Sequence, residues 1–261
     1  MRRLAVSLLA CAMMLWGQAA FAIELAAHHA EYKLKLGDQR GGDVSSGSGT
    51  MTYEVIDACD GWAVRQRLEM KLTNHDGQDI NMVSDYTTFE AKDGHSLQFH
   101  MRQTTDQAVT SEVAGDAVID HPGGGGTVTY TLPEAATKTL PEGVLFPTAH
   151  TVAILEAAEA GKKFLALPLF DGTSADGAQD SSIVINTWNE PTKTSFAALA
   201  NMPSGRVHIA FFDRDAASQS PDYEVSMRYW ANGIADGLTM DFGDFVMDGK
   251  LDQLVVAKPG C

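Results

Sequence analysis

The feature that most constrains the fold of this chain is an alternation of apolar and polar side chains over eleven residues beginning at Trp62. The run reads Trp-Ala-Val-Arg-Gln-Arg-Leu-Glu-Met-Lys-Leu, and Trp62, Val64, Leu68, Met70 and Leu72 fall on one face. The charged residues of the run fall on the other face. Because successive side chains of a β-strand point to opposite faces, this pattern predicts an antiparallel strand with one buried face and one face in water.

The same period of two recurs along most of the chain. Turns rich in Gly, Asp and Asn separate the alternating runs, as is typical of hairpins. The predicted strand segments are 32–36, 51–57, 62–72, 80–90, 96–103, 108–113, 117–120, 127–132, 163–167, 182–188, 206–214, 222–230, 238–242 and 245–256.

One segment departs from this period and predicts a helix. Pro147 and Thr148 suit its first turn, and Gly161 followed by two Lys residues suits its end. Val152 and Leu155 lie apart from the Glu residues around the helix, which makes it amphipathic. A helix of this length is too short to be stable alone, so we expect it to dock on the sheet.

These elements together predict a mainly β fold. About 12–14 antiparallel strands and one helix favour a single sheet that curls on itself into an open barrel, with the helix packed inside or against it. The polar or Gly-rich gaps at 37–49, 122–126, 171–180 and 216–221 do not resemble flexible linkers. We therefore expect residues 23–261 to form one domain.

The first residues indicate export. Arg2 and Arg3 precede an apolar run that reaches about Gly17, and Ala20-Phe21-Ala22 has the small-x-small form of a signal-peptidase site. We predict that residues 1–22 are a signal peptide cleaved after Ala22, which places the protein in the periplasm. A transmembrane anchor is the alternative, but the apolar run is short for a span.

A second processing route is open as well. Leu8-Leu9-Ala10-Cys11 resembles a lipoprotein box, in which the Cys becomes the lipidated first residue. Lipidation would anchor the protein to a membrane. The apolar residues that continue past Cys11 argue against this route, because a lipoprotein normally becomes polar there.

The cysteines predict one disulfide. Of three Cys residues, the signal peptide removes Cys11 and leaves Cys59 and Cys261. Two Cys residues in an oxidising compartment allow one pairing, although two free thiols remain the alternative. Asp60-Gly61 is a turn signal, so Cys59 lies between two strands. The bridge would fasten the final residue of the chain to this early turn.

Composition excludes some partners. The formal net charge is −15, and the loss of two Arg with the signal peptide makes the remaining chain more acidic. Such a chain is repelled by nucleic acid and by anionic lipid surfaces. Apolar residues make up 44% of the sequence, which is enough for a packed core.

No motif predicts catalysis, a cofactor or a metal. Residues 122–127 are Gly-rich but lack the Lys-Ser/Thr ending of a phosphate loop. The pairs His28-His29 and His95 with His100 point to opposite sides of a strand, so they do not predict zinc. Residues 171–177 lack the spaced carboxylates of a calcium loop. Residues 46–49 do not fit a nucleophile elbow. The sequence predicts no catalytic, cofactor-binding or metal-ligating residue.

Four local stretches are considered together: Asp60-Gly61-Trp62 with the Arg-Gln-Arg strand, residues 140–150, Leu169-Phe170-Asp171-Gly172 and Pro259-Gly260-Cys261. In combination they resemble the EipB family of alphaproteobacterial periplasmic proteins involved in cell-envelope integrity. The resemblance implies a single-domain β-spiral with a helix inside or against it. It implies a disulfide between Cys59 and Cys261, no established enzymatic activity, and a tetratricopeptide-repeat protein as periplasmic partner.

Three hypotheses for function follow. The first is a monomeric, non-enzymatic periplasmic protein that supports envelope integrity and stress resistance through protein–protein contact. The second is a carrier that holds a lipid or lipoprotein acyl chain inside the curled sheet. The third is a hydrolase, which would need a cleft with two titratable groups of strongly shifted pKa.

Overall fold

The computed structural model describes residues 23–39, 42–188, 192–214 and 220–258. The predicted signal peptide, with Cys11, and Cys261 lie outside these residues, so cleavage and the disulfide stay predictions. Within the described residues, no helix is long and apolar enough to cross a bilayer.

The described chain is built from hairpins that are interrupted by one helix. α1 spans Pro147–Glu159, and a short 3-10 helix, η1, spans Ala197–Leu199. The strands are β1 His28–Gln39, β2 Val44–Asp57, β3 Gly61–Asn74, β4 Asp79–Ala91, β5 Ser96–Thr105, β6 Ala108–Ile119, β7 Gly126–Leu132, β8 Ala136–Leu140, β9 Phe164–Leu169, β10 Gln179–Ile185, β11 Ser204–Asp213, β12 Tyr223–Trp230, β13 Ala235–Asp241 and β14 Phe245–Val256.

All fourteen strands of the described chain form one antiparallel sheet in the order β8-β7-β6-β5-β4-β3-β2-β1-β14-β13-β12-β11-β10-β9. Neighbours in the first half, and again in the second half, are consecutive in sequence, so hairpins connect them, and the connection between β10 and β11 is long enough to contain η1. The pairing of β1 with β14 joins the two halves. Because β8 and β9 are the two edges, the sheet is not closed, and the prediction of a curled, mainly β fold with one helix is confirmed.

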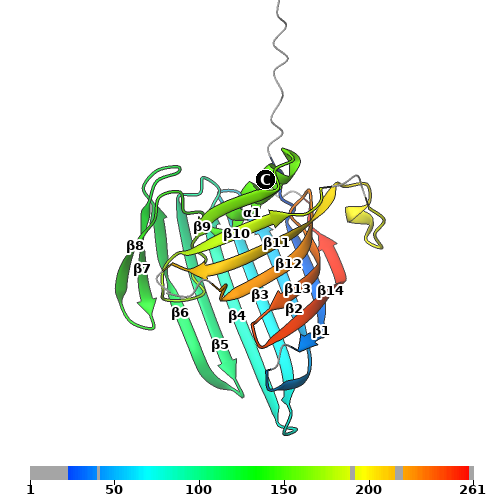
Figure 1. Cartoon of the computed structure of the whole chain (residues 1–261). Coiled ribbons are helices and arrows are strands. Elements are labelled where there is room, and N and C mark those ends of the chain that lie inside the picture. Colours follow the sequence, from blue (N-terminus) through cyan, green and yellow to red (C-terminus); the bar gives the residue numbers. More distant parts are fainter. Residues whose placement is uncertain (1–22, 40–41, 189–191, 215–219, 259–261) are drawn as a thin grey trace, which may run out of the picture.

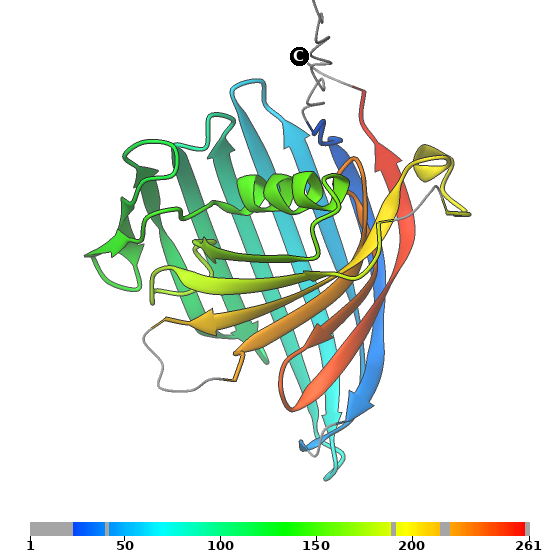
Figure 2. The same cartoon turned by 45° about the horizontal axis from the view of Figure 1, so that its top comes forward.

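The sheet curls so far that its two halves face one another. In Figures 1 and 2, β9–β12 pass in front of β3–β6 and run across them at a steep angle. The helix α1 lies across one end of the enclosed space (Figure 2). The period-two pattern explains this packing, because the apolar face of each alternating strand then points to the same interior.

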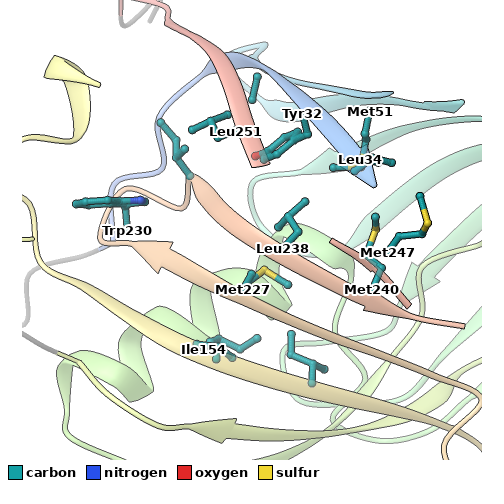
Figure 3. Packing of buried hydrophobic residues seen from close by; sticks show 14 of the residues in the cluster. Tyr32, Leu34, Met51, Ile154, Met227, Trp230, Leu238, Met240, Met247 and Leu251 are labelled. Atoms are coloured by element: carbon teal, nitrogen blue, oxygen red, sulfur yellow. The ribbon is translucent and has the colours of Figure 1, made fainter. Parts of the chain in front are cut away.

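The larger core lies near the join between the two halves. Cross-strand pairing places Tyr32 beside Met51 and beside Leu251. Methionines of the second half, among them Met227 and Met247, extend toward the same region (Figure 3). The helix completes this cluster with buried Ile154, Ala157 and Ala158, while Glu156 and Glu159 face water. The helix therefore packs inside the curl.

A second core fills the other end of the sheet, between β5–β7 and the chain on either side of α1. Phe99, Tyr130, Phe146 and Phe170 meet there edge-to-face, with ring centroids 5.3–6.4 Å apart. Phe146 directly precedes α1, and Phe170 directly follows β9. The aromatic cluster therefore fastens both ends of the helical connection to the sheet.

Two expectations about strands were wrong. The segments 108–113 and 117–120 form one strand, β6, because Gly115 continues the ladder where the backbone of β7 comes very close. A Cβ at Gly115 would lie 2.3 Å from the Thr129 carbonyl oxygen. β8 was missed because only Leu140 of its five residues is buried, so it carries no alternation.

The expected gap at 37–49 was also too long. β2 begins at Val44 and includes Gly47 and Gly49. A Cβ on Gly49 would lie 2.1 Å from the Glu69 carbonyl oxygen, so glycine is required by close strand contact and does not mark a loop. Residues 46–49 are therefore in a strand, and His28-His29 begin β1.

Candidate functional site

A cavity of about 460 Å³ lies inside the curl. One wall is formed by β1–β5, the facing wall by β11–β13, and α1 with the Leu25–Ala26 segment borders one end. Its volume falls in the range of about 300–1,000 Å³ that small-molecule sites occupy. The cavity exists because the inner faces of the two halves do not fill the space between them completely.

The wall formed by β11–β13 is apolar. Ile209, Val225, Leu238 and Met240 belong to it, and Met227 lies beside them. These residues sit on the inward face of their strands by register, since Ile209 pairs with Val225, which in turn pairs with Met240. Apolar contact is therefore the main interaction that this wall offers to a ligand.

Tyrosine rings form much of the remaining lining. Tyr32 donates its hydroxyl hydrogen bond to the Ala235 carbonyl oxygen at 2.7 Å, and Tyr86 donates to the Asp171 carbonyl oxygen. Burial raises the pKa of both phenols, and that of Tyr53. All three are therefore neutral at physiological pH and act as amphipathic surfaces.

The wall formed by β3–β5 carries three polar side chains that sequence reasoning missed. Gln66 of β3, Ser84 of β4 and Gln103 of β5 occupy inward positions and line the cavity. Ser84 pairs directly with Gln103 across the strands. The signal was present in the sequence, because Gln66 interrupts the apolar face of the residue 62–72 run. A polar residue at an inward position indicates space or a polar partner beside it.

Three other ionisable groups reach the cavity. Burial lowers the pKa of His28, although its hydrogen bond to the Ala26 carbonyl oxygen works in the opposite direction. Burial lowers the pKa of His150 to about 4. Burial raises the pKa of Asp171, whose carboxylate oxygens accept hydrogen bonds from Thr173 and from Gln179. Both imidazoles are neutral at physiological pH.

The buried His150 does not activate a serine. Its Nε2 lies 2.8 Å from Ser181 Oγ, and that hydroxyl lies 2.7 Å from the Leu167 carbonyl oxygen. A carbonyl oxygen only accepts, so Ser181 donates its hydrogen to Leu167 and accepts one from His150. An imidazole that donates to the hydroxyl cannot remove its proton, so the pair is structural.

A Ser-His-Glu group occurs on the outer face of the sheet. His208 of β11 has its Nδ1 2.8 Å from Ser226 Oγ and its Nε2 2.8 Å from Glu224 Oε2. Ser226 is in the middle of β12 and is paired on both sides, with His208 and Thr239. The pairing with β13 is irregular between Ser226 and Arg228, but Ser226 does not lie at the sharp strand-to-helix turn that places a nucleophile beside N–H donors. The group therefore resembles a cross-strand ladder more than a catalytic site.

Glu90 connects the sheet to the helix. It lies on the inward face of β4, and 2% of its surface is exposed. Its carboxylate oxygens accept hydrogen bonds from the backbone N–H groups of Thr148 at 2.6 Å and Ala149 at 2.8 Å. Phe146 is the N-cap of α1, and no acidic residue lies in the first turn, so Glu90 supplies the cap from another element.

The residues singled out from sequence fall in separate places. Cys59 is in the β2–β3 turn with φ 69°, whereas Cys261 lies outside the described residues. His28 lines the cavity and His29 faces outward. Among the described residues, no three His, Cys, Asp or Glu side chains gather closely enough to hold a metal ion. Asp171, the first residue of the segment that lacks a calcium-loop pattern, lines the cavity.

The strand register brings the end of β14 close to the Cys59 turn. His28 pairs with Val256 on one side and with Val55 on the other. The two positions are thus separated by one strand, or about 10 Å between their Cα atoms. Cys59 follows Val55 by four residues. A bridge from the chain end to this turn is therefore within reach, and the pairing itself stays a prediction.

Comparisons of the sequence and of the structure with known proteins point to the same family. The model of the EipB-like family matches residues 19–258. The chain is 31% identical over 250 residues to the cell envelope integrity protein EipB of Brucella abortus, covering 93% of this chain and 88% of the relative. A crystal structure of a β-barrel-like protein of a domain of unknown function from Brucella abortus superposes with a TM-score of 0.83 at 30% identity. That match covers 91% of this chain and 100% of the other.

Proposed function

The chain belongs to the EipB-like family, and from this membership we propose that it supports the integrity of the cell envelope, the role stated in the name of its Brucella relative. We further propose that it acts in the periplasm by binding and not by catalysis. Two observations support this: His150 donates to Ser181 and so cannot remove its proton, and the His208–Ser226 pair lies within a paired strand and not at a nucleophile turn.

The ligand that the geometry favours is an amphiphile held in the internal cavity. The single observation that carries this proposal is the cavity of about 460 Å³ with an apolar wall. Met51, Met101, Met227 and Met240 line it, and flexible thioether side chains adapt to the shape of an acyl chain. Each buried methylene of such a chain contributes about 0.8 kcal/mol. The protein would then carry or retain a lipid or lipoprotein acyl chain in the envelope.

We expect the substitution Val55→Trp to abolish acyl-chain binding, with at least a tenfold weaker affinity. Val55 lines the cavity, and an indole at this position would occupy the space of the ligand. The control is Thr52→Trp, which places the same side chain on the outer face of the same strand. Binding is measured by native mass spectrometry of delipidated protein mixed with a monoacylglycerol.

Equal binding by Val55→Trp and by the unmodified protein would contradict a ligand site in the cavity. Unfolding curves of both Trp variants show whether each is folded before binding is compared. A second check is the mass of any ligand that copurifies with the exported protein, since it should be present with Thr52→Trp and absent with Val55→Trp.

The second candidate function is contact with a periplasmic protein, such as the tetratricopeptide-repeat partner that family resemblance implies. The observation that favours it is apolar exposure on the outer face. Val255 of β14 is 65% exposed and Ile56 of β2 is 37% exposed, and both lie near the same end of the sheet. The two strands lie on either side of β1, so one partner surface can contact both side chains.

We expect Val255→Glu combined with Ile56→Glu to remove this contact without affecting the cavity. A carboxylate in an apolar interface is costly when it has no partner. The measurement is crosslinking in intact cells followed by mass spectrometry, with Thr52→Glu as the matched outer-face control. Unchanged crosslinks in the double variant would exclude this surface as the contact.

A further inference from the structure

The two walls of the cavity differ in what they offer to a ligand. The wall from β11–β13 is apolar, whereas Gln66, Ser84 and Gln103 stand on the facing wall. Their side chains make no hydrogen bond to any other group of the described residues, although all three are half-buried. Unpaired polar groups that face an internal space are available to a ligand.

Strand register places these three polar side chains close to one another on the inner face of the sheet. Ser84 pairs directly with Gln103, and Gln66 pairs with Tyr86, which lies two residues after Ser84 on β4. Inward neighbours along one strand and across the next are about 5–8 Å apart. A single ligand head group can therefore contact two or all three side chains. Amide and hydroxyl groups both donate and accept hydrogen bonds.

Positive charge is absent from the lining. No Lys or Arg is among the described residues that border the cavity, and His28 and His150 are neutral at physiological pH. Asp171 is the acidic group there, and its oxygens are already held by Thr173 and Gln179. A carboxylate or phosphate placed in this cavity would lose its hydration without gaining a counter-ion, which is strongly unfavourable.

We propose that the cavity selects an amphiphile whose polar head is uncharged, with its chain against β11–β13 and its head on Gln66, Ser84 and Gln103. This inference rests on the proposed ligand function and specifies the chemical class of the ligand. An acyl chain joined through an ester or amide to a hydroxylated head has this chemistry. Both a free acylglycerol and the acylated end of a lipoprotein can supply it.

The test compares three probes that share one chain length and differ in the head: a monoacylglycerol, the corresponding fatty acid anion, and the corresponding alkyltrimethylammonium. Affinities for the delipidated protein are measured by isothermal titration at pH 8, below the critical micelle concentration of each probe. We expect the monoacylglycerol to bind at least tenfold more tightly than either charged probe. Mass spectrometry of copurified ligand then distinguishes an acylglycerol from a lipopeptide.

Two substitutions test whether the wall that carries Gln66, Ser84 and Gln103 determines which head group the cavity binds. Gln66→Leu should weaken monoacylglycerol binding about tenfold, because the head loses a hydrogen-bond partner. Gln66→Arg should tighten fatty acid binding at least tenfold, because it adds the missing positive charge. The matched control is Gln98→Arg, which makes the same change at an outward position of β5. Ser84→Ala is a milder variant in case Gln66 substitutions do not fold.

The outcomes separate this inference from the function on which it rests. If none of the three probes binds, the amphiphile-carrier function itself is wrong. If the fatty acid or the ammonium probe binds as well as the monoacylglycerol, the cavity holds a ligand but does not select an uncharged head. If Gln66→Arg and Gln98→Arg give the same fatty acid affinity, the polar wall does not contact the head, and the inference is overturned.

Discussion

Replacing Glu90 with Ala is expected to lower the free energy of unfolding by about 3 kcal/mol at pH 5, the cost of leaving buried N–H groups without an acceptor. At this pH the raised pKa of about 7 keeps Glu90 protonated, and its carboxyl group accepts from the backbone N–H groups of Thr148 and Ala149 in the first turn of α1. Because the helix has no cap of its own, its first turn would lose its only acceptor among the described side chains. Since Thr148 and Thr151 also border the cavity, loosening the helix should weaken ligand binding as well.

The same residue predicts a pH dependence. Burial raises the pKa of Glu90 to about 7, while its hydrogen bonds to the helix N–H groups limit the rise. The folded state therefore holds the proton more tightly than the unfolded state, in which the value is the ordinary 4.5. The corresponding stability is fully present below about pH 4.5. This contribution to the free energy of unfolding is lost as pH rises through about 7, and the loss is on the order of 3 kcal/mol.

Denaturant unfolding between pH 4.5 and 8 measures both effects. Glu90→Gln cannot ionise and keeps one acceptor oxygen, so its stability should lack this component of the pH dependence. Glu156→Ala, an exposed position on the same helix, is the control and should change stability by less than about 0.5 kcal/mol. Identical pH profiles for Glu90→Gln and the unmodified protein would show that Glu90 does not titrate in this range.

Loss of the predicted Cys59–Cys261 disulfide is expected to have the largest effect, about 5 kcal/mol of unfolding free energy by the chain-entropy argument. A bridge between these positions would close a loop of roughly 200 residues, and long loops give the largest gain in that argument. The bridge would also hold β14 beside the Cys59 turn. Such a loss is comparable with the whole net stability of many domains.

The exported protein should first be digested under non-reducing conditions. A single linked peptide pair containing Cys59 and Cys261 is expected. Unfolding of the protein is then compared before and after reduction. The control is the Cys59→Ser/Cys261→Ser double variant. Its stability should equal that of the reduced protein and should not change when reductant is added. Recovery of both cysteines as free thiols would disprove the bridge.

The sequence alone predicted the class of fold and most of its strands. This succeeded because alternation is a local property, so each strand carries in its own residues the assignment of an inner and an outer face. The start of α1 at Pro147 was predicted for the same reason, since Pro favours a first helical turn wherever the helix packs. The family resemblance also came from local stretches, and the comparisons confirm it.

Close approach between strands was not predictable. Gly49 and Gly115 seemed to interrupt strands, because in isolation glycine favours turns and loops. Both are within strands, where the neighbouring backbone leaves no room for a Cβ. β8 had no alternation to find, since an edge strand with four exposed residues out of five buries too little.

The candidate site depended on tertiary structure almost entirely. Period two determined that Gln66, Ser84 and Gln103 face inward, but it could not show that they face a cavity and not a packed core. Glu90 likewise alternates as an ordinary strand residue, and only the curl of the sheet brings it to the start of α1, 58 residues away. Residue order specifies which side of each strand is buried, because that depends on neighbours in the chain. The space that the buried sides enclose depends on how far the whole sheet bends. That bending is determined by many contacts between residues that are distant in sequence.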